Sequence, residues 1–290
     1  MHSDYIMSIN QALNYIYLNL DKNLTVDEIA DHCCFSKYYF NRVFKLIVGE
    51  NIYSFIKRMK LENAAFKLRT SKDSPITNIA IEIGYSPSNF ASAFKQSFGL
   101  SATDYRKMNG VPFKDSFAVV FDHIHNLKKK ENIFEEIDAK MRIKRMEGMN
   151  LVYKRTICNY TRDLQGAWEI FCEEMEEKNL LDTNSRFVGI SYDDPLITDE
   201  DRCIYDMCMV VDQVSGINVH RIESGMYACY EFYDKLEKLI LVFNEIFAFW
   251  LPFCKYELDN KPSLEIYHEG VDEKGNISVE ICIPIKSRQN

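Results

Sequence analysis

Two short sets of side chains have residue types and spacings that could perform chemistry. The first is Lys37, Tyr38, Asn41, Arg42 and Lys45, which fall on one face of a helix because their spacing follows the helical repeat. Such a face can lie in the major groove of DNA and present Arg and Asn to base edges. The alternative is a solvent-exposed helix face that carries a few cations.

The second set centres on Glu265 in the segment Leu264-Glu265-Ile266-Tyr267. Side chains alternate along a strand, so Glu265 and Tyr267 share one face while Leu264 and Ile266 share the other. A carboxylate flanked by apolar residues is costly to bury without a partner. That partner is either a Lys or Arg on a solvent-exposed sheet face, or a cationic ligand.

The composition limits the class of protein that positions these residues. The chain has 290 residues, of which 47% are hydrophobic and 27% charged, which excludes a disordered chain and suggests about two domains. It has no run of about 18 apolar residues, so no membrane span is expected. We see no secretion signal at the N-terminus and expect a cytoplasmic protein.

The nine cysteines include the adjacent pair Cys33-Cys34 but no C-x-x-C motif. Their spacings match neither a zinc site nor a disulfide framework, so reduced thiols are expected. His123 and His125 have no third ligand nearby in the sequence, so a metal site is not expected there. We expect no cofactor.

The formal net charge of −8 hides an uneven distribution. Residues 1–110 carry 13 basic and 10 acidic residues, a net of +3. Residues 111–150 carry 8 and 7, a net of +1, and residues 151–290 carry 14 and 26, a net of −12. The mildly basic first part and the acidic last part therefore call for separate functional interpretations, although an acidic domain can also serve solubility alone.

The first third contains a duplication at an offset of 50 residues. The matching positions are Ile29-Ala30 with Ile79-Ala80, Ser36 with Ser86, Phe40 with Phe90, Phe44-Lys45 with Phe94-Lys95, and Gly49 with Gly99. No strict alternation typical of strands occurs before residue 110, so this third is predicted to be all-α.

Each copy predicts a helix-turn-helix unit, over about 24–49 and 74–99. In the first unit, Thr25 and Glu28 have capping-box spacing. The second helices are predicted over 37–48 and 87–98, each following a serine N-cap and ending at a glycine. A helix over about 51–69, ~30 Å long, joins the two units.

These residues resemble the AraC/XylS-type DNA-binding domain. The first half matches Ile29-Ala30, Ser36-Lys37-Tyr38-Tyr39-Phe40-Asn41-Arg42-Val43-Phe44-Lys45 and Gly49. The second half matches Ile79-Ala80, Gly84-Tyr85-Ser86-Pro87-Ser88-Asn89-Phe90, Phe94-Lys95, Phe98-Gly99-Leu100-Ser101 and Tyr105-Arg106. The resemblance covers about residues 5–107 and implies a sequence-specific DNA-binding transcription regulator that reaches two successive major grooves.

The resemblance also assigns base-reading positions in both units. With the neighbouring cations, the predicted DNA-binding residues are Lys37, Tyr38, Asn41, Arg42, Lys45, Ser88, Asn89, Ser92 and Lys95. The family often has Arg where Ser92 stands, and Pro87 takes the place of Lys37. The first unit is therefore expected to supply most of the sequence discrimination, and the second mainly to position the protein.

Residues 111–139 are expected to form a linker. Its apolar patch, 117–127, is expected to pack on one of the domains. Its lysine run, 128–130, either contacts the DNA backbone or is a solvent-exposed face, and we favour the second interpretation.

Residues 140–290 predict an α+β domain that is also repeated. The predicted strands are 151–160, 186–192, 203–211, 217–222, 226–232, 263–268 and 277–285, and the predicted helices are 164–179 and 235–250. An offset of about 74–77 relates the segment 187–192 to 264–268 and 206–210 to 280–284. Two β-α-β-β repeats with antiparallel sheet fit this pattern.

This part of the chain resembles the GyrI-like effector-binding domain. The matching segments are Tyr205-Asp206, Gly225-Met226-Tyr227-Ala228, Trp250-Leu251-Pro252, Pro262-Ser263-Leu264-Glu265-Ile266-Tyr267 and Ile281-Cys282-Ile283-Pro284-Ile285. The resemblance implies a pocket between the two repeats for bulky apolar or cationic small molecules, with Glu265 as its glutamate. Aromatic walls could add cation–π attraction of about 0.5–2 kcal/mol each, unless they are ordinary core residues. The predicted effector-binding residues are Glu265, Tyr267, Trp168, Tyr205, Tyr227 and Trp250.

Together these features predict a non-enzymatic transcription regulator, an activator, that binds double-stranded DNA and a small-molecule effector and meets RNA polymerase. One alternative is a hydrolase of strained electrophilic compounds, with Glu265 as general base and Tyr267 as its helper. The other makes the acidic domain a protein-interaction or toxin-neutralising module.

Overall fold

A computed structural model describes residues 2–108, 114–212 and 218–288. The chain divides into two compact units, Met1–Pro112 and Phe113–Asn290, which we describe separately. The predicted domain boundary after residue 110 and the first residue of the predicted strand 217–222 lie outside the described residues. In the described part of the chain, no helix combines the length and the apolar character that a membrane crossing requires.

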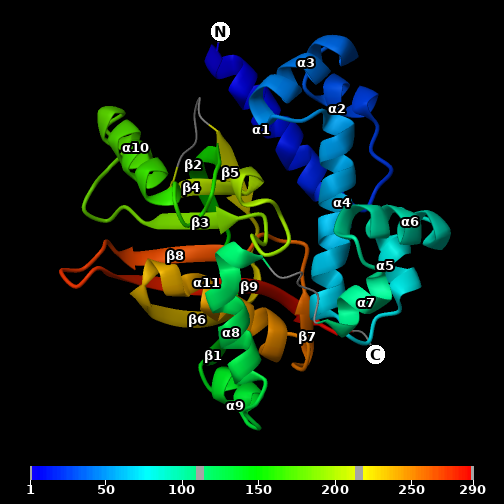
Figure 1. Ribbon diagram of the computed structural model, residues 1–290. Coiled ribbons are helices and arrows are strands. Elements are labelled where there is room, and N and C mark those ends of the chain that lie inside the picture. Colours follow the sequence, from blue (N-terminus) through cyan, green and yellow to red (C-terminus); the bar gives the residue numbers. More distant parts are fainter. Residues whose placement is uncertain (1, 109–113, 213–217, 289–290) are drawn as a thin grey trace. The chain divides into compact units, whose positions relative to one another are not determined.

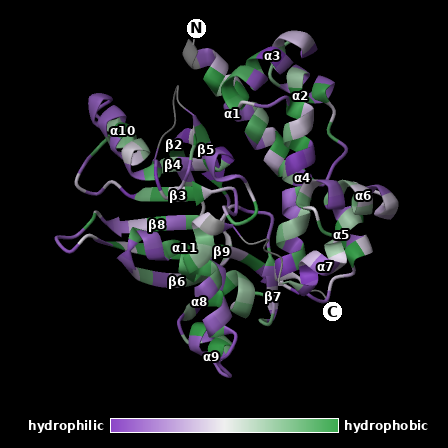
Figure 2. Ribbon diagram, viewed as in Figure 1, coloured by the Kyte–Doolittle hydropathy of each residue, from purple (hydrophilic) through white to green (hydrophobic). Residues whose placement is uncertain are grey.

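The regular elements of the first unit, over its described residues 2–108, are all helices, as predicted (Figure 1). Its helices are α1 (His2–Leu18), α2 (Val26–His32), α3 (Lys37–Val48), α4 (Ile52–Thr70), α5 (Ile76–Glu82), α6 (Pro87–Phe98) and α7 (Ala102–Lys107). Hydrophobic and hydrophilic residues mix along α1 and α4 (Figure 2), as expected for helices that bury one face. Helices α2–α3 and α5–α6 form the two predicted helix-turn-helix units, joined by α4.

The ends of these helices follow local sequence chemistry. The predicted capping box at Thr25 is present. Ser86 accepts a backbone hydrogen bond as N-cap of α6, whereas Ser36 occupies the N-cap position of α3 but its side chain makes no such bond. Gly49 and Gly99 end α3 and α6 with φ of 86° and 71°, a left-handed conformation that disfavours any side chain.

Each helix-turn-helix unit has an aromatic core. In the first, the ring centroid of Phe44 lies 5.9 Å from that of Phe40 and 5.5 Å from that of Phe55 on α4. In the second, the Phe94 ring lies 5.3 Å from both Phe90 and Tyr105. These rings are buried on one side of α3 and α6, so the opposite side of each helix is left for solvent or DNA.

The second unit contains one antiparallel sheet. Its strands are β1 (Met141–Met146), β2 (Met149–Ile157), β3 (Phe187–Ser191), β4 (Ile204–Val211), β5 (Val219–Ile222), β6 (Gly225–Lys235), β7 (Tyr256–Leu258), β8 (Leu264–Glu269) and β9 (Asn276–Ser287). The strand order is β1-β6-β9-β8-β3-β4-β2-β5, with β7 paired to β9. Figure 1 shows the strands stacked in this order, from β1 at the bottom to β2 and β5 at the top.

The two predicted β-α-β-β repeats are present. They are β2-α10-β3-β4, with α10 at Leu164–Glu177, and β6-α11-β8-β9, with α11 at Leu239–Glu245. The strands β3 and β8 meet at the middle of the sheet, where Gly189 pairs with Glu265. The second repeat therefore continues the sheet of the first.

Some elements differ from the predictions. The expected helix 235–250 is divided into the short η3 (Leu236–Lys238), α11 and the π-helical turn η4 (Ile246–Trp250). The strands β1 and β7 were not predicted. Residues 118–138 of the expected linker contain α8 (Ala118–Leu127) and α9 (Ile133–Asp138). The prediction that the apolar patch 117–127 packs on a domain is confirmed, because Leu127 of α8 lies with Ile137 of α9 in the core under α11.

The sheet has two distinct faces. One face packs against α10 through Met207 and Met209 and against α11 through Ala228 and Ile281. Strand registers place Glu265 on this face, because it pairs with Ile281 of β9. The opposite face holds a separate cluster of buried residues: Met146, Leu151, Tyr153, Val188, Ile190, Cys208, Ile222, Tyr227, Cys229, Leu264 and Cys282.

Candidate DNA-binding surface and effector site

The predicted base-reading face of α3 is open to solvent. Tyr38 is 88% exposed, and Arg42 and Lys45 are also exposed, while Asn41 is half-buried. The Lys37 ammonium forms a 2.6 Å ion pair with Asp27 of α2, and this hydrogen bond raises the pKa of Lys37. Arg42 and Lys45 are therefore the cations that α3 can bring to DNA without first breaking that pair.

The corresponding face of α6 is exposed and polar, but Lys95 is the one charged residue among its predicted contacts. Ser88, Asn89, Ser92 and Lys95 all lie on it. The Ser92 hydroxyl donates a 3.3 Å hydrogen bond to the Ser88 carbonyl of the same helix. The geometry thus places all nine predicted DNA-binding residues on α3 and α6, with more cationic groups on α3.

Glu265 lies at the centre of a buried polar group on β8. Glu265 is only 4% exposed. The Tyr205 hydroxyl donates to Glu265 Oε2 at 2.7 Å and the Tyr267 hydroxyl at 3.1 Å, and Ser191 adds a further hydrogen bond. The two tyrosine oxygens are 3.1 Å apart, and one carboxylate oxygen accepts hydrogen bonds from both phenols.

Burial raises the pKa of Glu265, and the hydrogen bonds from Tyr205, Tyr267 and Ser191 oppose that rise only in part. Burial and the nearby carboxylate hold the pKa of both tyrosines well above their usual range, so the phenols remain protonated donors. Among the described residues, Glu265 has no Lys, Arg or His as an ion-pair partner. The alternative of a salt bridge on an exposed sheet face is therefore wrong.

Trp168 of α10 joins this group. Its ring centroid lies 5.2 Å from that of Tyr267 and 6.3 Å from that of Tyr205, edge-on to both. Tyr160 approaches Tyr205 from another side at 5.5 Å. Three of the predicted aromatic residues thus lie together at this site: Tyr205 and Tyr267 donate to the Glu265 carboxylate, and Trp168 packs against their rings.

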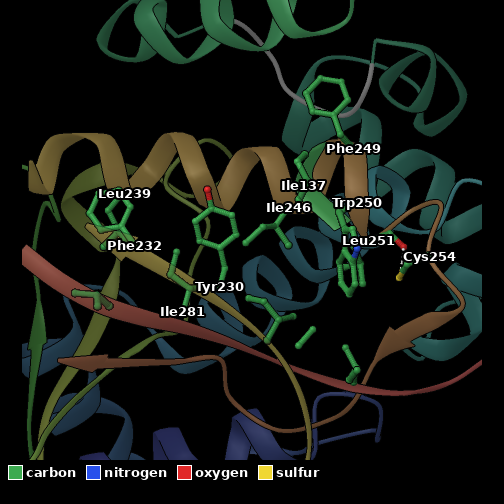
Figure 3. Packing of buried hydrophobic residues seen from close by; sticks show 14 of the residues in the cluster. Ile137, Tyr230, Phe232, Leu239, Ile246, Phe249, Trp250, Leu251, Cys254 and Ile281 are labelled. Carbon is green, nitrogen blue, oxygen red and sulfur yellow. Dashed lines mark hydrogen bonds between the residues drawn. The ribbon is translucent and has the colours of Figure 1, made fainter. Parts of the chain in front are cut away.

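The other two predicted aromatic residues lie elsewhere. Tyr227 is buried in the cluster on the opposite sheet face. Trp250 is buried beside Ile137 and Leu251 in the core under α11 (Figure 3), where its indole N–H donates a 2.7 Å hydrogen bond to Asp138. The structure therefore does not bring Tyr227 or Trp250 to Glu265.

Gly189 is a residue of this site that sequence reasoning missed. A β-carbon there would lie 1.8 Å from Tyr205 Oη and 3.1 Å from Glu265 Oε2. Only glycine lets the phenol lie across β3 and reach the carboxylate. The available signal was an isolated glycine inside a predicted strand, which indicates a close approach.

A second buried polar group on the opposite face was also missed. Arg155 holds Asp206 through two hydrogen bonds of 2.8 and 2.7 Å, and His220 and Tyr192 reach the same carboxylate at 2.6 and 2.9 Å. Burial acts to raise the pKa of Asp206, but Arg155 and His220 outweigh it and hold the pKa below its usual value. The charge of Asp206 is thus balanced by Arg155, whereas no basic residue in the described part of the chain balances the charge of Glu265.

Comparisons with known proteins agree with both units. Residues 139–286 match the family of GyrI-like small molecule binding domains, and residues 29–108 match a helix-turn-helix domain. The transposon Tn10 TetD protein of Escherichia coli is 34% identical over 100 residues, which are 34% of this chain and 72% of TetD. The regulatory protein SoxS of Escherichia coli K12 is 31% identical over 99 residues, which are 34% of this chain and 92% of SoxS.

A solved structure, the C-terminal domain of EcmrR, is 16% identical to this chain. The alignment covers 51% of this chain and 98% of that domain, with a TM-score of 0.43.

The tandem helix-turn-helix units and the repeated sheet domain define a DNA-binding transcription regulator with an effector-binding domain. The chain belongs to the AraC-type family of such regulators, with a GyrI-like small molecule binding domain as its second part.

Proposed function

We propose that this regulator activates transcription in response to a bulky cationic small molecule that binds at Glu265. The observation that supports this most is a buried carboxylate with hydroxyl donors but no basic partner among the described residues. The domain limits we propose are 1–110 for DNA binding, 111–139 as connection and 140–290 for effector binding. We place the protein in the cytoplasm, with RNA polymerase as a partner.

The electrostatics of the site favour a cation over an anion or a neutral compound. An ionised carboxylate in an apolar surrounding is costly unless an opposite charge compensates it. A cation would supply that charge, and the faces of Trp168, Tyr205 and Tyr267 would add cation–π attraction. Since Glu265 is 4% exposed, entry of the ligand requires these aromatic side chains to move.

For DNA, we propose that α3 supplies most of the base discrimination through Tyr38, Asn41 and Arg42, with Lys37 and Lys45 beside them. Helix α6 would position the protein through Ser88, Asn89, Ser92 and Lys95. The support is the exposure of both faces and the charge difference between them, since Lys95 is the one cation among the four residues of α6.

The experiment on the effector compares tetraphenylphosphonium with tetraphenylborate, which has nearly the same size and shape but the opposite charge. Both are titrated into the full chain, and binding is followed by the quenching of tryptophan fluorescence. We expect the phosphonium ion to bind and the borate ion not to bind. Equal binding of both ions would mean that shape, and not the charge of Glu265, selects the ligand.

We also propose that the site binds its ligand without converting it. A general base must reach the proton that it removes, but Oε2 of Glu265 already accepts hydrogen bonds from two phenols and the residue is almost fully buried. Incubation with epoxides tests this. Turnover by the wild type that is lost in Glu265→Gln would show that the domain is a hydrolase.

A further inference from the structure

The face of the sheet opposite Glu265 gathers two thiols and a carboxylate. Cys229 of β6 and Cys282 of β9 are directly paired in the strand register, and their sulfur atoms are 3.4 Å apart. Glu280 Oε2 lies 3.6 Å from the Cys282 sulfur. All three residues are buried, and their potential ligand atoms lie within 4.8 Å of one another.

These distances match the edges of a metal coordination tetrahedron. With Zn–S bonds of ~2.3 Å, Zn–O bonds of ~2.1 Å and tetrahedral angles, two sulfurs are about 3.8 Å apart and a sulfur and an oxygen about 3.6 Å. The corresponding separations here are 3.4 Å and 3.6 Å. The third separation, between the Cys229 sulfur and the Glu280 carboxylate, is at most 4.8 Å. Side-chain shifts of up to about an ångström would therefore accommodate the ion.

The first repeat provides an internal comparison. By strand register, Asp206 and Cys208 of β4 correspond to Glu280 and Cys282 of β9, but Cys208 pairs with Tyr153 where Cys282 pairs with Cys229. The Asp206 carboxylate is moreover held by Arg155. Among the described residues, only the second repeat brings three such ligands together.

We propose that Cys229, Cys282 and Glu280 form a binding site for a thiophilic divalent metal ion of the Zn²⁺ type. On binding, each thiol releases its proton to solvent and becomes a thiolate ligand. The three ligands then carry three negative charges, which the ion and the ammonium of Lys144 balance. Lys144 already lies 2.6 Å from Glu280 Oε1.

The ligand set determines which ions fit. Thiolates favour Zn²⁺ and its chemical relatives, whereas Mg²⁺ and Ca²⁺ require oxygen ligands. Three protein ligands leave the fourth tetrahedral position to water. The spacing of 51 residues between Cys229 and Glu280 explains why the sequence shows no metal motif, since the ligands meet only through the pairing of β6 with β9.

The test is a titration of the reduced full chain with Co²⁺, a spectroscopic substitute for Zn²⁺. We expect one equivalent to produce thiolate-to-cobalt charge-transfer absorption and the visible bands of tetrahedral Co²⁺, and one equivalent of Zn²⁺ to remove both. Mg²⁺ should remove neither. Absence of these absorptions at one equivalent of Co²⁺ would overturn the proposal.

Variants locate the ion. Cys229→Ser and Cys282→Ser should each weaken binding by more than about 100-fold, because even the partners behind metal ligands contribute about 10–100-fold. Cys208→Ser is the matched control at the corresponding position of the first repeat and should bind normally. If a folded Cys229→Ser variant gave an unchanged titration curve, the signal would instead come from other thiols, such as the exposed Cys34.

A third variant protects the test against misfolding of the cysteine variants. Glu280→Gln keeps both thiols and removes one charged ligand, so we expect the charge-transfer absorption to remain while the affinity falls by at least about 10-fold. Circular dichroism and thermal unfolding confirm that each variant is folded. An unchanged affinity in Glu280→Gln would overturn the assignment of the carboxylate as a ligand.

Discussion

Replacement of Glu265 by glutamine removes the charge at the proposed effector site and almost nothing else. The two side chains have nearly the same shape, and the glutamine oxygen can still accept from Tyr205 and Tyr267. Two unit charges 4 Å apart attract by about 4 kcal/mol at an effective dielectric constant of about 20. If most of that attraction is lost, the affinity for tetraphenylphosphonium falls on the order of 100- to 1,000-fold.

Protonation of Glu265 should have the same effect as the substitution. Burial raises the pKa of this carboxyl, so the proton competes with the cation as the pH falls through the raised pKa. Wild-type affinity should therefore decrease toward acidic pH, whereas the weak affinity of Glu265→Gln should not change. Isothermal titration calorimetry at several pH values measures both trends.

The same raised pKa fixes the sign of the effect on stability. A group whose pKa is higher in the folded state contributes stability below its unfolded pKa and loses it as the pH rises through the folded pKa. Without ligand, Glu265→Gln should thus unfold at a higher temperature than the wild type at pH 8, and the difference should vanish at pH values below the unfolded pKa. Differential scanning calorimetry measures it.

Glu269→Gln serves as the control, because Glu269 is an exposed carboxylate on the same strand. It should leave both cation affinity and stability within experimental error of the wild type. Cation affinities within about threefold of each other in Glu265→Gln and wild type would refute the electrostatic reasoning.

Four further substitutions test other parts of the account. Arg42→Ala should weaken DNA binding by about 1–3 kcal/mol and relax specificity at one base pair, while Ser92→Ala costs less; equal losses in a binding titration would contradict the division of roles between α3 and α6. Gly189→Ala should lower cation affinity at least about tenfold, since its β-carbon would lie 1.8 Å from Tyr205 Oη and displace that phenol; unchanged calorimetric affinity would show that Tyr205 is dispensable. Arg155→Ala should lower the free energy of unfolding by about 3–5 kcal/mol, because it leaves a buried carboxylate without its main partner; a loss below about 1 kcal/mol in urea denaturation would be inconsistent with a buried ion pair.

The first unit was predictable because its structure is encoded locally. Helix ends are marked within a few positions by Gly49, Gly99 and the capping residue Thr25. The duplication shows the same signals twice, so the helices α3 and α6 begin and end at the predicted residues. At Ser36 the residue type correctly predicted the N-cap position, but not the side-chain hydrogen bond that usually accompanies it.

The second unit was less predictable because its sites depend on strand pairing. The sequence showed that Glu265 and Tyr267 share a face, but not that β3 would bring Gly189 beside them. Strand β1 was missed because Arg142, Lys144 and Arg145 interrupt its apolar pattern, as charges commonly do on an edge strand.

The sequence predicted both Trp168 and Trp250 at the effector site, but the structure places only Trp168 there. Trp168 lies on a regular helix that faces the centre of the sheet. Trp250 ends a π-helical turn, which changes the rotation of the chain and therefore the face that a side chain occupies. Such a turn cannot be read from hydrophobic periodicity.

The central claim, that one chain couples DNA reading to a cation at Glu265, is tested most directly by transcription in vitro. The template carries a sequence selected for binding by the full chain, and wild type and Glu265→Gln are compared with and without tetraphenylphosphonium. We predict that the cation raises transcript yield with the wild type only, although both proteins bind the DNA equally. The same response in both proteins, or in neither, would contradict the account.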